Sequence, residues 1–237
     1  MTAAQVTCEE KWNVRAFRVL APMMALVVLA TGCAGARPGV AAQIGQQVIT
    51  MRSVNAMSAD LCAVFLPQIK EQGQSFPLRV IRNIAVKALV DRRIAEKVAA
   101  AYDVQPGSTY TRQLAAQQQT ALALEPELRD NYLYLATAQS YVEAIQEAIG
   151  AASLRADGVA APTLADQVAR GREVIATWAD DNGVVVDPRF GFTVIDGQLA
   201  PQDNSVTTAV SAEAVAGTVE QMDPADVAKL PASLRCG

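Results

Sequence analysis

The chain of 237 residues contains no histidine. This absence excludes Ser-His-Asp and Cys-His catalysis, zinc sites that use imidazole, and histidine-based pH switches. Aromatic residues make up only 5% and the formal net charge is −4, so a nucleic-acid-binding face is not expected. Hydrophobic residues form 51% of the chain, which is too high a share for a disordered protein.

Motifs that carry site chemistry are also missing from the sequence. There is no GxxxxGK[ST] or GxGxxG phosphate loop and no CxxC pair. The acidic residues Asp180 and Asp181 stand at an expected helix end, and Asp223 and Asp226 have the spacing of helix-capping residues. We therefore expect a protein that is not an enzyme, with no catalytic residue, no cofactor and no metal site.

The first 32 residues are typical of an export signal. Basic residues precede an apolar run at 19–30, which is shorter than the about 20 residues that a helix needs to span a bilayer. Residues 29–33 (LATGC) resemble a bacterial lipobox, whose cysteine receives a diacylglycerol before cleavage. We expect a signal peptide at 1–32, lipidation at Cys33 and a tether at 33–42. The alternative is an ordinary signal peptide or an uncleaved anchor.

The four cysteines are interpreted from this compartment. Cys8 lies within the signal peptide and Cys33 is expected to be acylated, which leaves Cys62 and Cys236. In an exported protein the simplest expectation is a disulfide between these two. It would close a loop of about 175 residues, worth roughly 4–5 kcal/mol in the chain-entropy model. Two free thiols are the alternative.

Hydrophobic periodicity predicts a mainly α fold with a small β element. Helices are expected at 51–72, 76–102, 109–124, 125–149 and 163–180, and weaker ones at 212–219 and 224–230. Strands are expected at 40–50, split by Gly45, at 184–187 and 190–195, and at 206–210. Residues 198–205 are expected to be loop, and 153–162 a linker. We expect the strands within 43–50 and 184–195 to pair with each other.

Several positions within these helices carry specific expectations. Pro67 should kink or end the first helix. The helix at 76–102 has one continuous apolar stripe, which includes Ile84 and Ala88, and its charged residues should form a solvated face. These charged residues are Arg82, Lys87, Asp91, Arg92, Arg93, Glu96 and Lys97. The tyrosines Tyr132, Tyr134 and Tyr141 are interpreted as packing residues.

Two stretches of the sequence resemble a known protein family. Residues 44–50 (IGQQVIT) and 81–104 resemble the N-terminal chaperone module of SurA-type and PrsA-type foldases, and the resemblance covers about residues 40–180. Residues 187–191 (DPRFG) and 230–237 (LPASLRCG) are similar to actinobacterial lipoproteins built on that module. The resemblance implies a SurA-like helical module at 43–182 and a C-terminal extension at 183–237 that packs back on it.

The resemblance also implies a function. Such modules act as chaperones that shield extended apolar segments of exported proteins, often beside a parvulin-type prolyl isomerase domain with active-site histidines. This chain has neither room for that domain nor a histidine, so prolyl isomerase activity is not expected. The expected partners are exported polypeptides, with the membrane reached through lipid on Cys33 at its extracytoplasmic face.

The sequence leaves two alternatives open. One is whether the apolar stripes leave an open groove or form a closed core. The other is whether the protein is instead an envelope scaffold lipoprotein that binds one folded partner.

Overall fold

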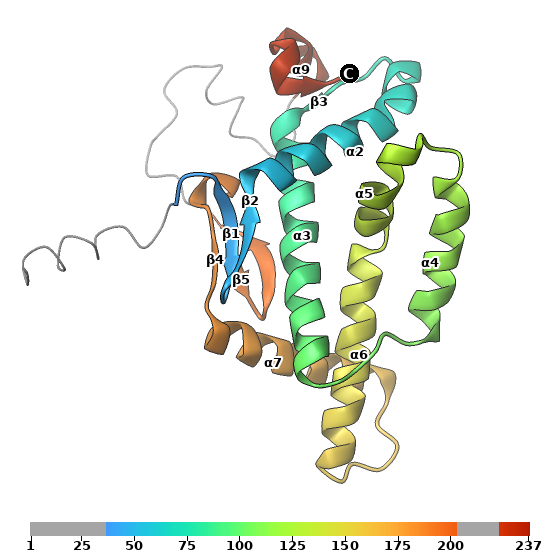
Figure 1. Cartoon of the computed structure of the whole chain (residues 1–237), viewed down its shortest axis with the longest axis vertical. Coiled ribbons are helices and arrows are strands. Elements are labelled where there is room, and N and C mark those ends of the chain that lie inside the picture. The colour runs from blue at the N-terminus through green and yellow to red at the C-terminus, as the bar shows by residue number, and fades with distance from the viewer. Residues whose placement is uncertain (1–36, 203–222) are drawn as a thin grey trace, which may run out of the picture. The chain divides into compact units, whose positions relative to one another are not determined.

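The structure is a computed structural model that describes residues 37–202 and 223–237. The part that it describes is mainly helical with a few short strands (Figure 1), as the sequence predicts. The helices are α2 (Met51–Glu71), α3 (Leu78–Ala101), α4 (Ser108–Ala121), α5 (Pro126–Ala136), α6 (Ala138–Ala156), α7 (Leu164–Asn182) and α9 (Pro224–Lys229), with 3₁₀ turns η2 (Pro188–Phe190) and η3 (Ala232–Leu234). The strands are β1 (Val40–Ile44), β2 (Gln47–Thr50), β3 (Phe76–Pro77), β4 (Val184–Val186), β5 (Phe192–Ile195), β6 (Gln198–Pro201) and β7 (Arg235–Cys236).

The fold described below is that of the unit Pro38–Gly237. Strand β1 starts at Val40, inside the range expected for the tether. The expected signal peptide at 1–32 and lipidation site Cys33 lie outside the described residues, as do the strand expected at 206–210 and the helix expected at 212–219.

The expected pairing of N-terminal and C-terminal strands is confirmed for β4. Strand β1 lies between β2 and β4 and is antiparallel to both, with Ala42 opposite Val186 and Ile44 opposite Val184. Strand β5 pairs instead with β6, so the expected loop at 198–205 is wrong at its start. The turn of this hairpin is Asp196-Gly197, and both residues have positive φ, which suits a tight two-residue connection.

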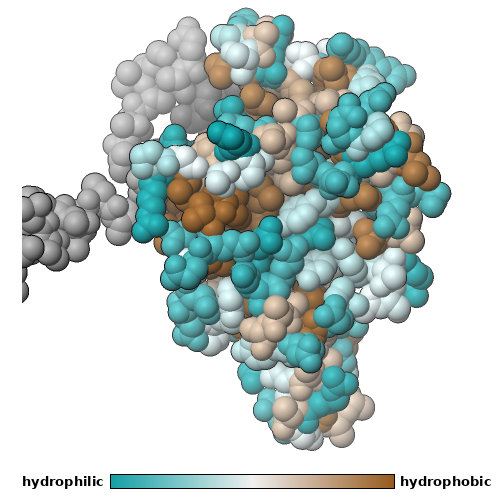
Figure 2. Space-filling view, viewed as in Figure 1, coloured by the Kyte–Doolittle hydropathy of each residue, from teal (hydrophilic) through white to brown (hydrophobic). Residues whose placement is uncertain are grey.

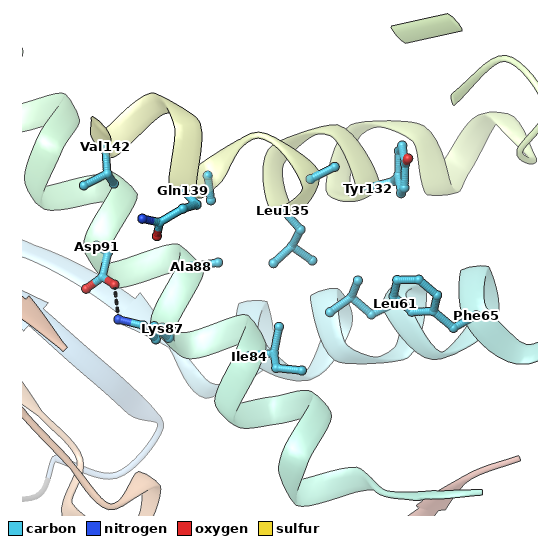
Figure 3. Close-up of a pocket in the computed structure, with 12 residues that line it drawn as sticks. Leu61, Phe65, Ile84, Lys87, Ala88, Asp91, Tyr132, Leu135, Gln139 and Val142 are labelled. Carbon is cyan, nitrogen blue, oxygen red and sulfur yellow. Dashed lines mark hydrogen bonds and ion pairs between the residues drawn. The ribbon is translucent and has the colours of Figure 1, made fainter. Parts of the chain in front are cut away.

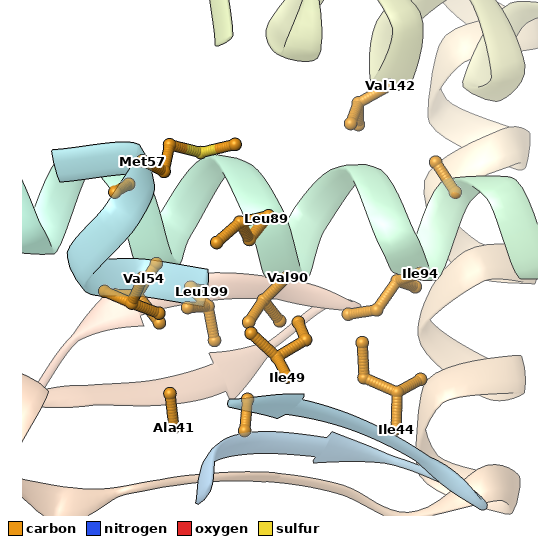
Figure 4. Packing of buried hydrophobic residues seen from close by; sticks show 14 of the residues in the cluster. Ala41, Ile44, Ile49, Val54, Met57, Leu89, Val90, Ile94, Val142 and Leu199 are labelled. Carbon is orange, nitrogen blue, oxygen red and sulfur yellow. The ribbon is translucent and has the colours of Figure 1, made fainter. Parts of the chain in front are cut away.

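Helix α3 lies at the centre of the fold (Figure 1), with the strands on one side and α5 and α6 on the other. Val90 and Ile94 are fully buried and point toward Ile44 and Ile49 of the strands (Figure 4). Val142 of α6 approaches α3 from the opposite side (Figure 4). The apolar stripe of α3 is therefore covered on more than one side, which agrees with its continuous spacing.

Capping residues begin two of the helices. The Thr50 hydroxyl accepts a hydrogen bond from the Ser53 N–H at the start of α2. Thr163 and Asp166 form a reciprocal capping box at the start of α7. Pro67 neither ends α2 nor separates it into two elements, because the helix continues to Glu71.

The helix expected at 125–149 is wrong as a single element. It is divided into α5 and α6 at Thr137, whose backbone has φ −111° and ψ 1°. The buried Thr137 hydroxyl donates to the Leu133 carbonyl and accepts from Arg92 of α3, so a contact distant in sequence occupies the break. Helix α6 then continues to Ala156, which shortens the linker expected at 153–162.

Helices α6 and α7 cross at two glycines. A Cβ placed on Gly150 would clash with the backbone carbonyl of Gln167, and one on Gly171 would clash with that of Gln146. The two backbones are therefore in direct contact, which only residues without a side chain permit.

The C-terminal residues contact α2 and β3. Cys62 of α2 and Cys236 of β7 form a disulfide with a Cα–Cα distance of 5.7 Å, within the range that such a bond requires. Strand β7 pairs with β3, so Phe76 and Pro77 are extended and α3 begins at Leu78 and not at the expected residue 76. The predicted disulfide is thus present in the structure, and the predicted short helix near 224–230 is confirmed as α9.

Candidate functional site

An apolar groove lies between α2 and α3 on one side and α5 and α6 on the other. Its larger hollow has a volume of about 400 Å³. Figure 3 shows Leu61 and Phe65 of α2 facing Leu135 and Tyr132 of α5 across this space, with Ile84 of α3 beside them. The residues that line it are Leu61, Phe65, Ile84, Lys87, Ala88, Asp91, Tyr132, Leu135, Ala136, Ala138, Gln139 and Val142.

A second hollow of about 280 Å³ continues the groove along the seam between α2 and α3. Phe65 and Ile84 line both hollows. Phe76 of β3, which pairs with the disulfide-bonded Cys236 of β7, also lines this hollow. The residues that line this second hollow are Phe65, Gln68, Ile69, Gln72, Phe76, Val80, Ile81 and Ile84.

The large apolar side chains of the groove are open to solvent. Ile84 is 51% exposed, Phe65 42% and Phe76 39%. Ile84 belongs to the apolar stripe predicted for α3, and Phe65 has helical spacing from the buried Leu61 of α2, yet neither is buried. Part of each stripe therefore faces a groove and not the core, and exposed apolar clusters of this kind are typical of interaction sites.

The lining of the larger hollow includes an ion pair between a partly exposed lysine and a buried carboxylate. Lys87 Nζ lies 2.6 Å from Asp91 Oδ2 and also donates to the carbonyl oxygen of Leu199 in β6, at 2.7 Å. Asp91 is only 6% exposed, and its Oδ1 accepts the Leu199 N–H at 2.7 Å. Burial raises the pKa of Asp91, while the hydrogen bond from Lys87 opposes that shift. The expectation that the charged residues of α3 form a solvated face is wrong for Asp91, because β6 covers it.

Arg92 is the second exception to the expected solvated face. Its guanidinium lies 4.2 Å from the ring centroid of Tyr134 and 5.0 Å from that of Tyr141. It also donates to the Tyr134 carbonyl and to the Thr137 hydroxyl. Arg92 therefore connects α3 to the junction of α5 and α6, which form one wall of the groove.

The three tyrosines have separate places around this wall. Tyr134 and Tyr141 pack against Arg92, as the packing interpretation predicts, and burial raises the pKa of Tyr134 to about 12. Tyr132 instead lines the larger hollow, and its hydroxyl donates to Gln117 of α4 at 2.7 Å. The Asn131 amide next to it donates to Asp60 of α2, which connects α5 to the opposite wall.

The lining of the groove carries no net formal charge. Lys87 and Asp91 are the ionised residues among those that line the two hollows, and they pair with each other. The other polar groups at the groove are mainly the amides Gln68, Gln72 and Gln139. Figure 2 shows, on one face of the molecule, that brown apolar areas are separated by polar surface, so apolar surface does not extend across that whole face.

Two other kinds of site are absent from the described ranges. Residues 37–202 and 223–237 contain no group of three or more Cys, Asp or Glu side chains arranged to hold a metal ion. Among the helices of these same ranges, none combines the length and the apolar character that crossing a bilayer requires.

Comparisons with known proteins identify no relative. No protein-family model matches the chain. No curated protein and no solved structure matches it either.

Proposed function

We propose that the protein is a lipid-anchored, extracytoplasmic chaperone-like module that binds apolar segments of unfolded or extended polypeptides. Binding needs no ATP and no covalent step, and the module has no prolyl isomerase activity. The observation that supports this proposal is the open groove in which Phe65, Ile84 and Phe76 are each more than a third exposed.

The energetics of covering these side chains support a binding role. Full burial of a large apolar side chain is worth about 1.5–3 kcal/mol, so covering the exposed part of each contributes about 1 kcal/mol. Three such side chains supply only part of a micromolar affinity, which corresponds to about 8 kcal/mol. These three side chains therefore support binding that is weaker than micromolar and reversible, which suits a module that must release its clients.

The charge of the groove supports a broad range of clients. A neutral lining that includes amide groups contains no unpaired charge that would select one complementary partner. A scaffold that binds one folded partner is the alternative, and such specificity usually relies on matched charges or on clashes with other partners.

The test is suppression of aggregation. The full chain, with its disulfide intact, is added in molar excess to a chemically unfolded client protein, and light scattering is followed after dilution. We expect scattering to fall. Ile84→Asp places a charge at the centre of the groove and should remove most of this effect.

Leu164→Asp is the matched control, because Leu164 is 60% exposed at the first position of α7, outside the groove. It should protect the client as the wild type does. No suppression by the wild type at molar excess contradicts the proposal, and a single stoichiometric partner in a pull-down would favour the scaffold.

A further inference from the structure

We infer that the groove binds its polypeptide ligand as an amphipathic helix, with an uncharged apolar stripe facing α2 and α3. The inference rests on the proposed function and adds the conformation and chemistry of the bound segment. It comes from the backbone of the groove walls, the charge of the lining and the length of the two hollows.

The walls of the groove offer almost no β-strand edge to a ligand. They are formed by α2, α3, α5 and α6, whose backbone groups bond within their own helices. The strand at the groove, β3, consists of Phe76 and Pro77 and is paired with β7. Its free edge is two residues long and includes a proline, which has no N–H to donate, so it is too short to hold a ligand as an extra strand.

The lack of a longer strand edge decides which ligand conformation fits. An extended segment pressed into the groove would place its own N–H and C=O groups against apolar side chains without partners, which is costly. A helix bonds these groups internally and presents only side chains. Exposed side chains such as Phe65 and Ile84 can then pack between the side chains of the ligand.

The lining limits which side chains the ligand carries. Lys87 and Asp91 neutralise each other within 2.6 Å, so a charged ligand residue in the groove would have no partner there and would lose its hydration. The stripe that faces the groove is therefore uncharged. Charged residues of the ligand belong on the opposite, solvated face of its helix.

The extent of the groove sets the length of the stripe. Along α3 the two hollows reach from Val80 to Asp91, which at 1.5 Å per residue is about 16 Å. A helical stripe at positions i, i+3, i+4 and i+7 spans about 10 Å and fits within this length.

The test compares two peptides of identical composition, measured by fluorescence anisotropy with the full chain. One is an 18-residue peptide, held helical by a lactam bridge on its polar face, with leucines at i, i+3, i+4 and i+7. The other carries the same residues with leucines at alternate positions, where they share one face only in an extended chain. We expect the helical peptide to bind at least tenfold more tightly.

Variants locate the binding in the groove. Ile84→Asp should weaken binding of the helical peptide at least tenfold, and Phe65→Ala should weaken it by a smaller factor. Leu164→Asp should leave it unchanged. Circular dichroism of each variant confirms that the helices are retained, and the two groove variants give independent readings if one is misfolded.

The outcomes separate this inference from the proposed function. Equal or tighter binding of the alternating peptide overturns the helical inference. Palmitate serves as a lipid probe of the same groove, and tighter binding of palmitate than of the helical peptide also overturns it. If neither peptide binds but client aggregation is still suppressed, the inference fails and the chaperone-like function stands. If aggregation is not suppressed either, both fail.

Discussion

Replacing Gly150 with alanine tests the contact between α6 and α7 most directly. In an exposed helix interior this change stabilises by about 1 kcal/mol, because alanine has the higher helix propensity. At Gly150 the new methyl group would clash with the Gln167 backbone carbonyl, and a backbone group cannot rotate away as a side chain can. The helices must separate, and overpacking of this kind costs about 1–3 kcal/mol or more.

The expected net result is therefore opposite in sign to the propensity effect. We expect Gly150→Ala to lower the free energy of unfolding by about 2 kcal/mol or more. Gly171→Ala should do the same, because its methyl group would meet the Gln146 backbone from the other helix. The measurement is urea unfolding followed by circular dichroism, with the disulfide intact in all variants.

Gly107→Ala provides the control for this experiment. Gly107 precedes α4, has no atom within 4 Å of a Cβ placed on it and has a negative φ. Its replacement should change the free energy of unfolding by less than about 1 kcal/mol. The reasoning is refuted if Gly150→Ala is as stable as the wild type or more stable, because the two backbones would then not be in contact.

Three further predictions concern other parts of the molecule. Burial raises the pKa of Asp91 in the folded state above its ordinary 3.8, so the folded state holds that proton more tightly and the free energy of unfolding should fall as pH rises above 3.8. Urea unfolding at several pH values should show this fall relative to Asp91→Asn. Parallel plots of unfolding free energy against pH for the two proteins would contradict it. Cys236→Ser opens a loop with a sequence separation of 174 and should lower the free energy of unfolding by up to about 5 kcal/mol; an unchanged urea midpoint would argue against a stabilising disulfide. Cys33→Ser should move the exported protein from the detergent phase to the aqueous phase in a phase-partition assay, and continued partition into detergent would exclude lipidation of Cys33.

Local signals predict most of the helices and turns. Thr50 and Thr163 begin helices through hydrogen bonds to residues three positions ahead, and Asp196-Gly197 forms a turn within two residues. Such features depend on neighbours in the sequence, so their residue types are sufficient to predict them.

Features that depend on distant partners could not be predicted. Asp91 is buried because Leu199, 108 positions away, donates a hydrogen bond to it, and the helix break at Thr137 is occupied by Arg92. The spacing of α3 places Asp91 off the apolar stripe but says nothing about what covers it. The contact between the backbones at Gly150 and Gly171 likewise has no local signal beyond the two glycines.

The sequence predicts the apolar residues of the groove but not its shape. Periodicity identifies Phe65 and Ile84 as members of apolar stripes, but it does not say which parts of a stripe other elements cover. The division of the expected helix 125–149 into α5 and α6 helps to form the wall opposite α2, and that division was not predicted. The residue types of the site were thus available from the sequence, while its shape was not.

The connections across the groove have a kinetic consequence. Arg92 fixes the junction of α5 and α6 to α3, and the Asn131–Asp60 hydrogen bond joins α5 to α2. The disulfide joins α2 to the β3–β7 strand pair, which contains Phe76. A groove whose walls are joined in this way is already formed before a ligand arrives. Association should therefore proceed in a single phase whose rate rises in proportion to ligand concentration, and differences among ligands should appear in how fast they leave.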